Sequence, residues 1–221
     1  MRVVAGLATF ALEIVGTGDR IDFGTAASAA MGIRTVSFAD GTSWNAATLL
    51  AMAQAPGEPV ATGRHWRLPA CFDPGFALDL PTWALAKQMP QSQLIERLLA
   101  TRFRVYMIGF LPGFPYMGGL PPELAMPRLS SPRQRVPANS IAIAGEMCAV
   151  YPWESPGGWN LIGKTPVPLF DLRQVEQPAM LAAGDLVSWY AIDKAEYEHL
   201  FAQCSQGERP RETFLAPGDA P

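Results

Sequence analysis

The first seventy residues alternate between apolar segments of strand type and segments of helical type. Residues 8–15 form a largely apolar run, residues 33–38 alternate between two faces as in a half-buried strand, and residues 64–72 form a further strand candidate. Helices are expected over the alanine-rich segment 25–31 and over 43–54, where the opening serine can cap the first turn. Interleaved strands and short helices predict a small sandwich of α/β type.

Two short helices are expected next. Pro81 suits a first helical turn, because its missing N–H would be unpaired there in any case. Apolar residues between 94 and 99 share one helical face, residues 104–108 return to a strand pattern, and residues 193–201 again look helical.

From Gly109 onward the pattern changes to short β-type runs between loops rich in proline and glycine. Runs at 140–144, 148–151 and 186–192 are typical of a small barrel or sandwich. We therefore expect a small α+β N-terminal domain over residues 1–88, a β-barrel domain over 89–204 and a disordered, polar tail over 205–221.

Composition adds constraints on class and partners. Charged residues make up 17% of the chain, against about 25% in ordinary soluble domains, which hints at a partner surface. The net charge of −3 without a basic run argues against nucleic acid. Three distant cysteines without CxxC spacing predict neither a disulfide framework nor a zinc site and favour a reducing, cytoplasmic location. No segment is long enough for a membrane span, and Glu13 interrupts the signal-like start, which is better explained as a first strand.

The proline block is the densest feature of the chain: 11 of its 21 prolines fall between Pro112 and Pro168. Within it, residues 158–165 match the phosphate-binding pattern G-x-x-x-x-G-K-[ST]. That chemistry needs a helix directly after the motif, and Pro166 and Pro168 prevent one. We reject a P-loop, so any ATP would not be held in this way.

Three other loops in this block are candidates for binding. Aromatic residues alternate with Gly and Pro over 109–121, and they either plug a core or form the wall of a ligand pocket. Arginines on the stiff loop 127–137 either clamp a carboxylate or phosphate or are simply solvated. The Gly-Gly pair at 157–158 makes either an anion-binding nest or a tight turn. The only two histidines, His65 and His199, lie outside these loops, which excludes a His-based triad or metal site there.

These loops together, and in order, resemble the KipI family, also called the 5-oxoprolinase B subunit or allophanate hydrolase subunit 1. The resemblance is carried by G-F-L-P-G-F-P-Y-M-G-G-L-P at 109–121, P-R at 127–128 and 132–133, V-P-A-N-S-I-A-I-A-G at 136–145, Y-P at 151–152, S-P-G-G-W at 155–159, L-I-G-K-T-P at 161–166 and L-F-D at 169–171.

The resemblance implies an α+β N-terminal domain followed by a cyclophilin-like β-barrel. It implies a role in the ATP-dependent hydrolysis of 5-oxoproline to glutamate, without a metal site in this chain. The partners would be a KipA-like protein, the C subunit of the complex, and a LamB/YcsF-like protein, its A subunit. The chain would be inactive alone. The expected substrate-binding residues are Phe110, Phe114, Tyr116, Arg128, Arg133, Ser155, Gly157, Gly158, Trp159 and Lys164.

Some positions depart from the family pattern. Met147-Cys148-Ala149 stands where Gln-Thr-Gly is usual, Leu98 where His is common, and Lys164 where Arg is usual. The catalytic base is not identified, and Glu154 and Asp171 are the nearest carboxylates. Sister functions remain open as alternatives: inhibition of a sensor histidine kinase, or a subunit related to allophanate hydrolase or urea carboxylase.

Overall fold

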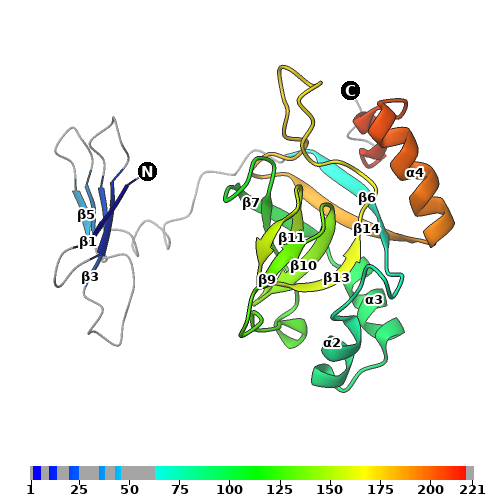
Figure 1. Cartoon of the computed structure of the whole chain (residues 1–221), viewed down its shortest axis with the longest axis horizontal. Helices are drawn as coiled ribbons and strands as arrows, with labels where there is room; N and C mark the ends of the chain where they lie inside the picture. Colours follow the sequence, from blue (N-terminus) through cyan, green and yellow to red (C-terminus); the bar gives the residue numbers. More distant parts are fainter. Residues whose placement is uncertain are drawn as a thin grey trace. The chain divides into compact units, whose positions relative to one another are not determined.

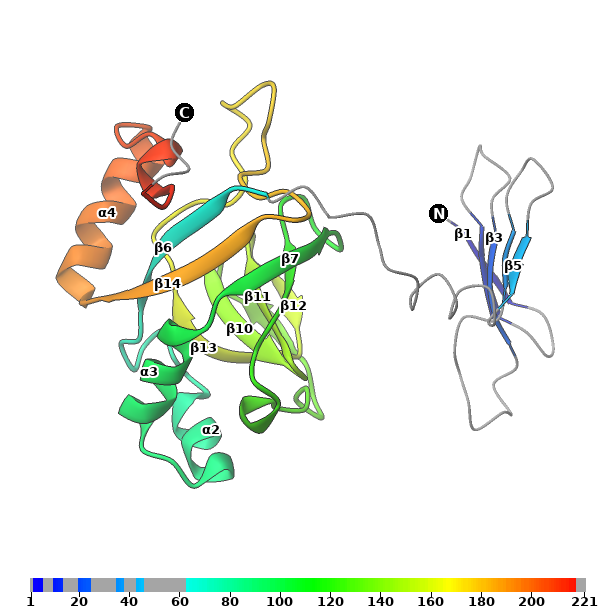
Figure 2. The same ribbon diagram turned by 180° about the vertical axis from the view of Figure 1, so that it is seen from behind.

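The computed structural model describes residues 2–5, 10–13, 20–24, 35–37, 43–45 and 63–217. These residues fall into two units, Met1–Pro59 and Val60–Pro221. Figures 1 and 2 show both units from opposite sides.

The described part of the first unit is a five-stranded antiparallel sheet with the strands in chain order. Its strands are β1 (Arg2–Ala5), β2 (Phe10–Glu13), β3 (Arg20–Gly24), β4 (Thr35–Ser37) and β5 (Ser43–Asn45). The strand expected around residues 33–38 is confirmed as β4. The helix expected from Ser43 is wrong over 43–45, because Trp44 pairs with Val36 and this pairing holds the backbone extended. The rest of that helix, and the one expected at 25–31, lie outside the described residues.

The second unit is a closed seven-stranded barrel, which confirms the small-barrel prediction. Its order is β10-β11-β8-β7-β14-β6-β13. The strands are β6 (His65–Cys71), β7 (Phe103–Ile108), β8 (Pro115–Gly118), β10 (Ser140–Ala144), β11 (Met147–Tyr151), β13 (Asn160–Lys164) and β14 (Leu186–Ile192). A separate two-stranded sheet pairs β9 (Arg133–Val136) with β12 (Ser155–Gly157).

Helices cover the barrel. They are α2 (Leu80–Lys87), α3 (Gln91–Ala100) and α4 (Lys194–Gln206), with 3-10 turns η1 (Pro122–Leu124) and η2 (Arg211–Phe214). In both views α4 runs beside β6, while α2 and α3 lie together at one end of the barrel (Figures 1 and 2). Pro81 lies in the first turn of α2, as expected. Among the described residues, no helix is long and apolar enough to cross a membrane.

The strand period of two divides the core into two clusters. In β10, Ile141 and Ile143 point into the main core, which also contains Trp66 and Leu68 of β6 and the buried face of α3. Ala142 and Ala144 point to the opposite side, into a second cluster. β10 is therefore buried on both faces, and a layer of side chains covers the outside of the barrel wall beside it.

The structure differs from the expected domain boundary at residue 88. β6 pairs in parallel with β14 along its whole length, from His65↔Leu186 to Cys71↔Ile192, so it belongs to the barrel. The predicted disordered tail is also wrong for residues 205–217. α4 continues to Gln206, Phe214 is buried in the main core, and the backbone N–H of Ala216 donates to the His65 carbonyl at 2.8 Å.

Candidate functional site

Five aromatic rings gather on the outer side of β8, β10 and β11. Phe114 is buried at the centre, with ring centroids 5.6 Å from Phe110, 4.9 Å from Tyr116, 5.1 Å from Tyr151 and 6.2 Å from Trp159. Most of these contacts are edge-to-face or tilted, which is the favourable arrangement for aromatic pairs. Four of the five residues were predicted site residues, and the structure brings them together.

Phe110 is the exposed member of this aromatic group. Its side chain is 66% exposed, and its backbone has φ +70°, in the left-handed region that non-glycine residues rarely adopt. The turn is held by Gly109 and Phe114, because the Gly109 N–H donates to the Phe114 carbonyl at 3.1 Å. Such strain is of order 1–3 kcal/mol and often marks a functional position.

Arginine side chains border the aromatic group. The guanidinium of Arg128 lies 5.7 Å from the Trp159 ring centroid, which is a cation–π contact. Arg133 of β9 donates from Nη2 to Asp79 Oδ1 at 2.7 Å, and Asp79 Oδ2 accepts the Leu161 N–H at 2.6 Å. Asp79 therefore ties the arginine to β13 of the barrel wall.

Two buried polar atoms in this region have no partner. They are Arg133 Nη1 and Ser155 Oγ. They belong to the sheet formed by β9 and β12, in which Arg133 pairs with Gly157 and Ser155 with Val136. Buried polar groups normally have hydrogen-bond partners, so two orphans in one small sheet indicate that a bound group completes the site.

The glycines allow close approaches in this sheet. A Cβ on Gly157 would lie 2.2 Å from the Tyr151 hydroxyl, so only glycine admits this ring. Burial raises the pKa of Tyr151, while its hydrogen bond to the Trp159 backbone and the nearby Arg128 and Arg133 act in the opposite direction. Gly158 accepts the Leu129 N–H through its carbonyl at 2.7 Å, which joins the arginine loop to this turn.

Sequence reasoning missed two members of this site, Asp79 and Tyr151. Asp79 was seen only as the residue before a helix, because its contacts are to residues 54 and 82 positions away. Its low exposure of 8% marks it as a buried charge that needs partners. Tyr151 lay in a quoted motif, and its alternation with buried Val150 could have placed it on the second face of β11.

Lys164 lies apart from this site. It ends β13, where its ammonium is 5.3 Å from the Phe76 ring and 5.9 Å from the Tyr197 ring. The P-loop rejection is confirmed, since residues 160–164 form a strand and no helix follows.

The two carboxylates considered as bases are engaged elsewhere. Glu154 accepts from Arg135 Nη2 at 2.7 Å on the surface. The Arg173 guanidinium hydrogen-bonds to Asp171 and lowers the pKa of that carboxyl below its ordinary value. Among the described residues, no group of three His, Cys, Asp or Glu is placed to hold a metal ion.

The departures from the family pattern fall in two environments. Leu98 and Cys148 are fully buried in the main core, where an imidazole or hydroxyl would need a partner. Met147 and Ala149 pack against the aromatic group. These two residues therefore shape the site directly, whereas the other two do so through the core.

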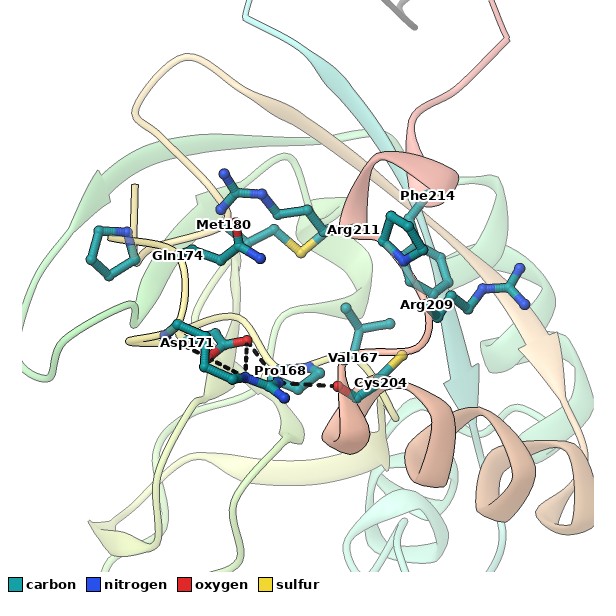
Figure 3. Close-up of a pocket in the computed structure, with 13 residues that line it drawn as sticks. Val167, Pro168, Asp171, Gln174, Met180, Cys204, Arg209, Arg211 and Phe214 are labelled. Carbon is teal, nitrogen blue, oxygen red and sulfur yellow. Dashed lines mark hydrogen bonds and ion pairs between the residues drawn. The ribbon is translucent and has the colours of Figure 1, made fainter. Parts of the chain in front are cut away.

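A pocket of about 70 Å³ lies elsewhere, between the loop after β13 and the segment after α4 (Figure 3). Its lining includes Asp171, Met180, Cys204 and Phe214 but none of the predicted substrate-binding residues. The guanidinium groups of Arg209 and Arg211 extend to opposite sides in Figure 3, so these two arginines do not converge on one ligand.

Known proteins resemble this chain over its middle part. Residues 27–181 match the family model for the carboxyltransferase domain, subdomains C and D. The 5-oxoprolinase B subunit of Bacillus subtilis is 43% identical over 130 residues, covering 59% of this chain and 54% of the relative. The Haemophilus influenzae protein of the same name is 44% identical, with 58% and 59% covered. The chain thus aligns with a little over half the length of these curated relatives.

Solved structures support the same placement. A conserved uncharacterized protein of Pyrococcus horikoshii is 37% identical with a TM-score of 0.58, covering 61% of this chain and 62% of that one. The Kluyveromyces lactis urea amidolyase, 21% identical with a TM-score of 0.60 over 66% of this chain and 10% of that one, shares the fold. The expected resemblance is confirmed: the chain belongs to the family of carboxyltransferase C and D subdomains that includes the 5-oxoprolinase B subunit.

Proposed function

We propose that this chain is the B subunit of an ATP-dependent 5-oxoprolinase complex that hydrolyses 5-oxoproline to glutamate. The observation that carries the proposal is the buried, unpartnered Arg133 Nη1, held in place by Asp79 beside the aromatic group. The names of the curated relatives supply the reaction. The barrel is inferred to be cyclophilin-like, and the complex to work in the cytoplasm.

In this proposal the substrate carboxylate binds Arg133 Nη1 and the Ser155 hydroxyl. A guanidinium and a hydroxyl are suitable donors for a carboxylate, and hydrogen bonds to charged groups are worth about 1.5–3 kcal/mol each. The rings of Phe110, Phe114 and Trp159 would flank the lactam. Tyr116, Arg128, Gly157 and Gly158 complete the proposed substrate-binding set.

A lactam amide resists hydrolysis because its nitrogen is a poor leaving group and its carbonyl is stabilised by resonance. ATP would supply a phosphoryl group to the lactam oxygen, which activates the ring carbon toward water. The role of this chain is to orient the ring and to neutralise the carboxylate, since positioning alone can account for several kcal/mol of barrier lowering. We infer that the base that activates water comes from a partner protein, because Glu154 and Asp171 are already paired.

Partners are proposed to be a KipA-like protein and a LamB/YcsF-like protein, as the C and A subunits of the complex. Three large apolar side chains on β7 and the turn after it support a docking surface next to the site: Tyr106 is 60% exposed, Met107 52% and Phe110 66%. Exposed apolar residues grouped in this way are typical of protein interfaces.

The test is to co-purify the chain with both proposed partners and to measure 5-oxoproline-dependent ATP hydrolysis. Arg133→Ala should abolish turnover while the complex still assembles. Arg135→Ala is the matched control, because that arginine lies on the same strand with a 78% exposed side chain. A wild-type complex without activity would overturn the function, whereas activity in Arg133→Ala would overturn only the carboxylate assignment.

A urea carboxylase-related role is the second candidate. A putative urea carboxylase of Emericella nidulans is 26% identical over 125 residues, which favours it. Urea-dependent ATP hydrolysis by the same complex, in place of 5-oxoproline-dependent hydrolysis, would select this alternative. Inhibition of a sensor histidine kinase stays a prediction, to be checked by an autophosphorylation assay.

A further inference from the structure

The lysine of the rejected P-loop motif occupies an unusual position. Lys164 is half-buried at the end of β13, where its backbone pairs with Cys71 of β6 and Ser140 of β10. Pairing on both sides places the side chain in a fixed part of the barrel wall. Its ammonium therefore has little freedom to move into solvent.

Among residues 63–217, Lys164 has no hydrogen bond and no ion pair. Its contacts are with aromatic rings, Phe76 at 5.3 Å and Tyr197 at 5.9 Å. These two rings pack on each other at 4.7 Å, and Phe201 stacks on Tyr197 at 5.9 Å. The lysine thus faces an aromatic wall formed by α4 and the turn after β6.

The charged and titratable groups around Lys164 do not offset its charge. On the turn after β6, Asp73 is taken up by Lys194, at 3.9 Å. Lys194 itself lies 5.9 Å from the same Phe76 ring, so a second cation approaches the cluster. Cys71 and Tyr197 are both held neutral, because burial raises the pKa of each.

The environment favours the neutral amine. Burial lowers the pKa of Lys164, and this effect outweighs the attraction of the two rings for the ammonium. A desolvated lysine next to another cation is the usual arrangement of a nucleophilic amine. No part of the proposed substrate site uses this group.

We propose that Lys164 is a nucleophilic lysine that accepts acyl groups from small acyl phosphates. The neutral ε-amine attacks the carbonyl carbon, a C–N bond forms and the C–O bond to phosphate breaks. Phosphate leaves with the electron pair of that bond, and the nitrogen releases one proton to solvent. The product is an uncharged amide, which no longer carries the cost of a buried charge.

The chain is well suited to a direct test because it contains only three lysines, Lys87, Lys164 and Lys194. The full chain is incubated with acetyl phosphate between pH 6.5 and 9.5. It is then digested with a protease that does not cut at lysine, and acetylation at each lysine is followed over time by mass spectrometry. The two other lysines are internal controls in the same sample.

Lys164 should be acetylated several-fold faster than both control lysines at pH 7.5, with its rate reaching a plateau at lower pH. Each unit by which an amine pKa falls raises the neutral fraction about tenfold at neutral pH, and lower intrinsic nucleophilicity offsets part of this gain. Lys164→Arg should remove the fast-modified peptide. Acetylation of Lys164 no faster than that of Lys87 and Lys194 would overturn the proposal.

A second variant tests the cause. Phe76→Ala removes one wall of the aromatic surface, so the rate advantage of Lys164 should shrink toward that of Lys87. An unchanged advantage in a folded Phe76→Ala chain would contradict the role of burial, and if that variant does not fold, the wild-type pH profile decides alone. Because the chain is labelled without partners or 5-oxoproline, failure here is separate from failure of the proposed function.

Discussion

Asp79 offers the sharpest test of how the site is held together. Asp79→Ala removes two acceptors at once: one for Arg133 Nη2 at 2.7 Å and one for the Leu161 N–H at 2.6 Å. The change leaves a buried amide N–H without a partner and an arginine without its counter-ion. Both effects act on the folded state, since neither contact is expected in the unfolded chain.

The size of the effect can be worked out contact by contact. Hydrogen bonds to charged groups contribute about 1.5–3 kcal/mol each. The Arg133 side chain is 27% exposed, so solvent screens its share, which belongs at the lower end of that range. We expect Asp79→Ala to lower the free energy of unfolding by roughly 3–4 kcal/mol, or Tm by about 8–12 °C for a unit of this size.

Asp79→Asn separates the two contacts. The amide oxygen can still accept the Leu161 N–H, while the ion pair with Arg133 is lost, so a cost of about 1–2 kcal/mol is expected. Glu154→Ala serves as the control, because it breaks an acid–arginine pair whose side chains are 51% and 78% exposed.

Urea unfolding followed by tryptophan fluorescence provides the measurement, with Tm from calorimetry as a second readout. Equal stabilities of Asp79→Ala and Glu154→Ala, within about 0.5 kcal/mol, would refute the reasoning that burial makes the Asp79 contacts strong.

Three further predictions concern the rest of the barrel unit. Asp185→Ala should cost about 3 kcal/mol or more in urea unfolding, because it leaves the buried Trp66 Nε1 and two backbone N–H groups without their acceptor; a loss below about 1 kcal/mol would contradict this. Gly157→Ala should cost about 1–3 kcal/mol by forcing a Cβ against the Tyr151 hydroxyl, and Tyr151→Phe should recover part of the lost Tm. Lys164→Met should be more stable than the wild type at pH 7, because burial lowers the folded-state pKa of this lysine. The gain should decline as pH rises through that lowered value and vanish above the unfolded value of about 10.4, where both states are neutral; a gain independent of pH would argue against this cause.

The sequence predicted well wherever local chemistry decides the structure. Pro166 and Pro168 exclude a helix after Lys164 by steric rules that need no tertiary context, and that prediction is confirmed. The short apolar runs of the barrel are likewise strands, because alternate residues must face two buried sides.

Prediction failed where distant partners decide. Ser43 satisfies the rules for a helix cap, yet pairing with Ser37 of β4 draws it into a strand. The tail after Ser205 is polar in composition, but a single buried Phe214 fixes it to the core.

The candidate site shows the same division. The aromatic and glycine motifs were found because they are contiguous in sequence. Lys164 was assigned to the same site because it follows Trp159 closely, but an extended strand advances about 3.3 Å per residue, and the five residues of β13 place its end at another cluster. Asp79 was missed for the opposite reason, since no local pattern links it to Arg133.

The parallel pair of β6 and β14 has a consequence for how the barrel can be assembled. Arg64 and Asp185, which join the two strands at one end through a 3.0 Å hydrogen bond, are 121 residues apart in sequence. During synthesis the first strand of the barrel must therefore wait for the last one before its hydrogen bonds can form. Contacts of such long range slow folding, because the entropy of closing the intervening chain is lost before the pairing is gained. A chain that ends before Leu186 would leave β6 and β7 as two open edges, and open edges are the places where strands of different molecules pair and aggregate.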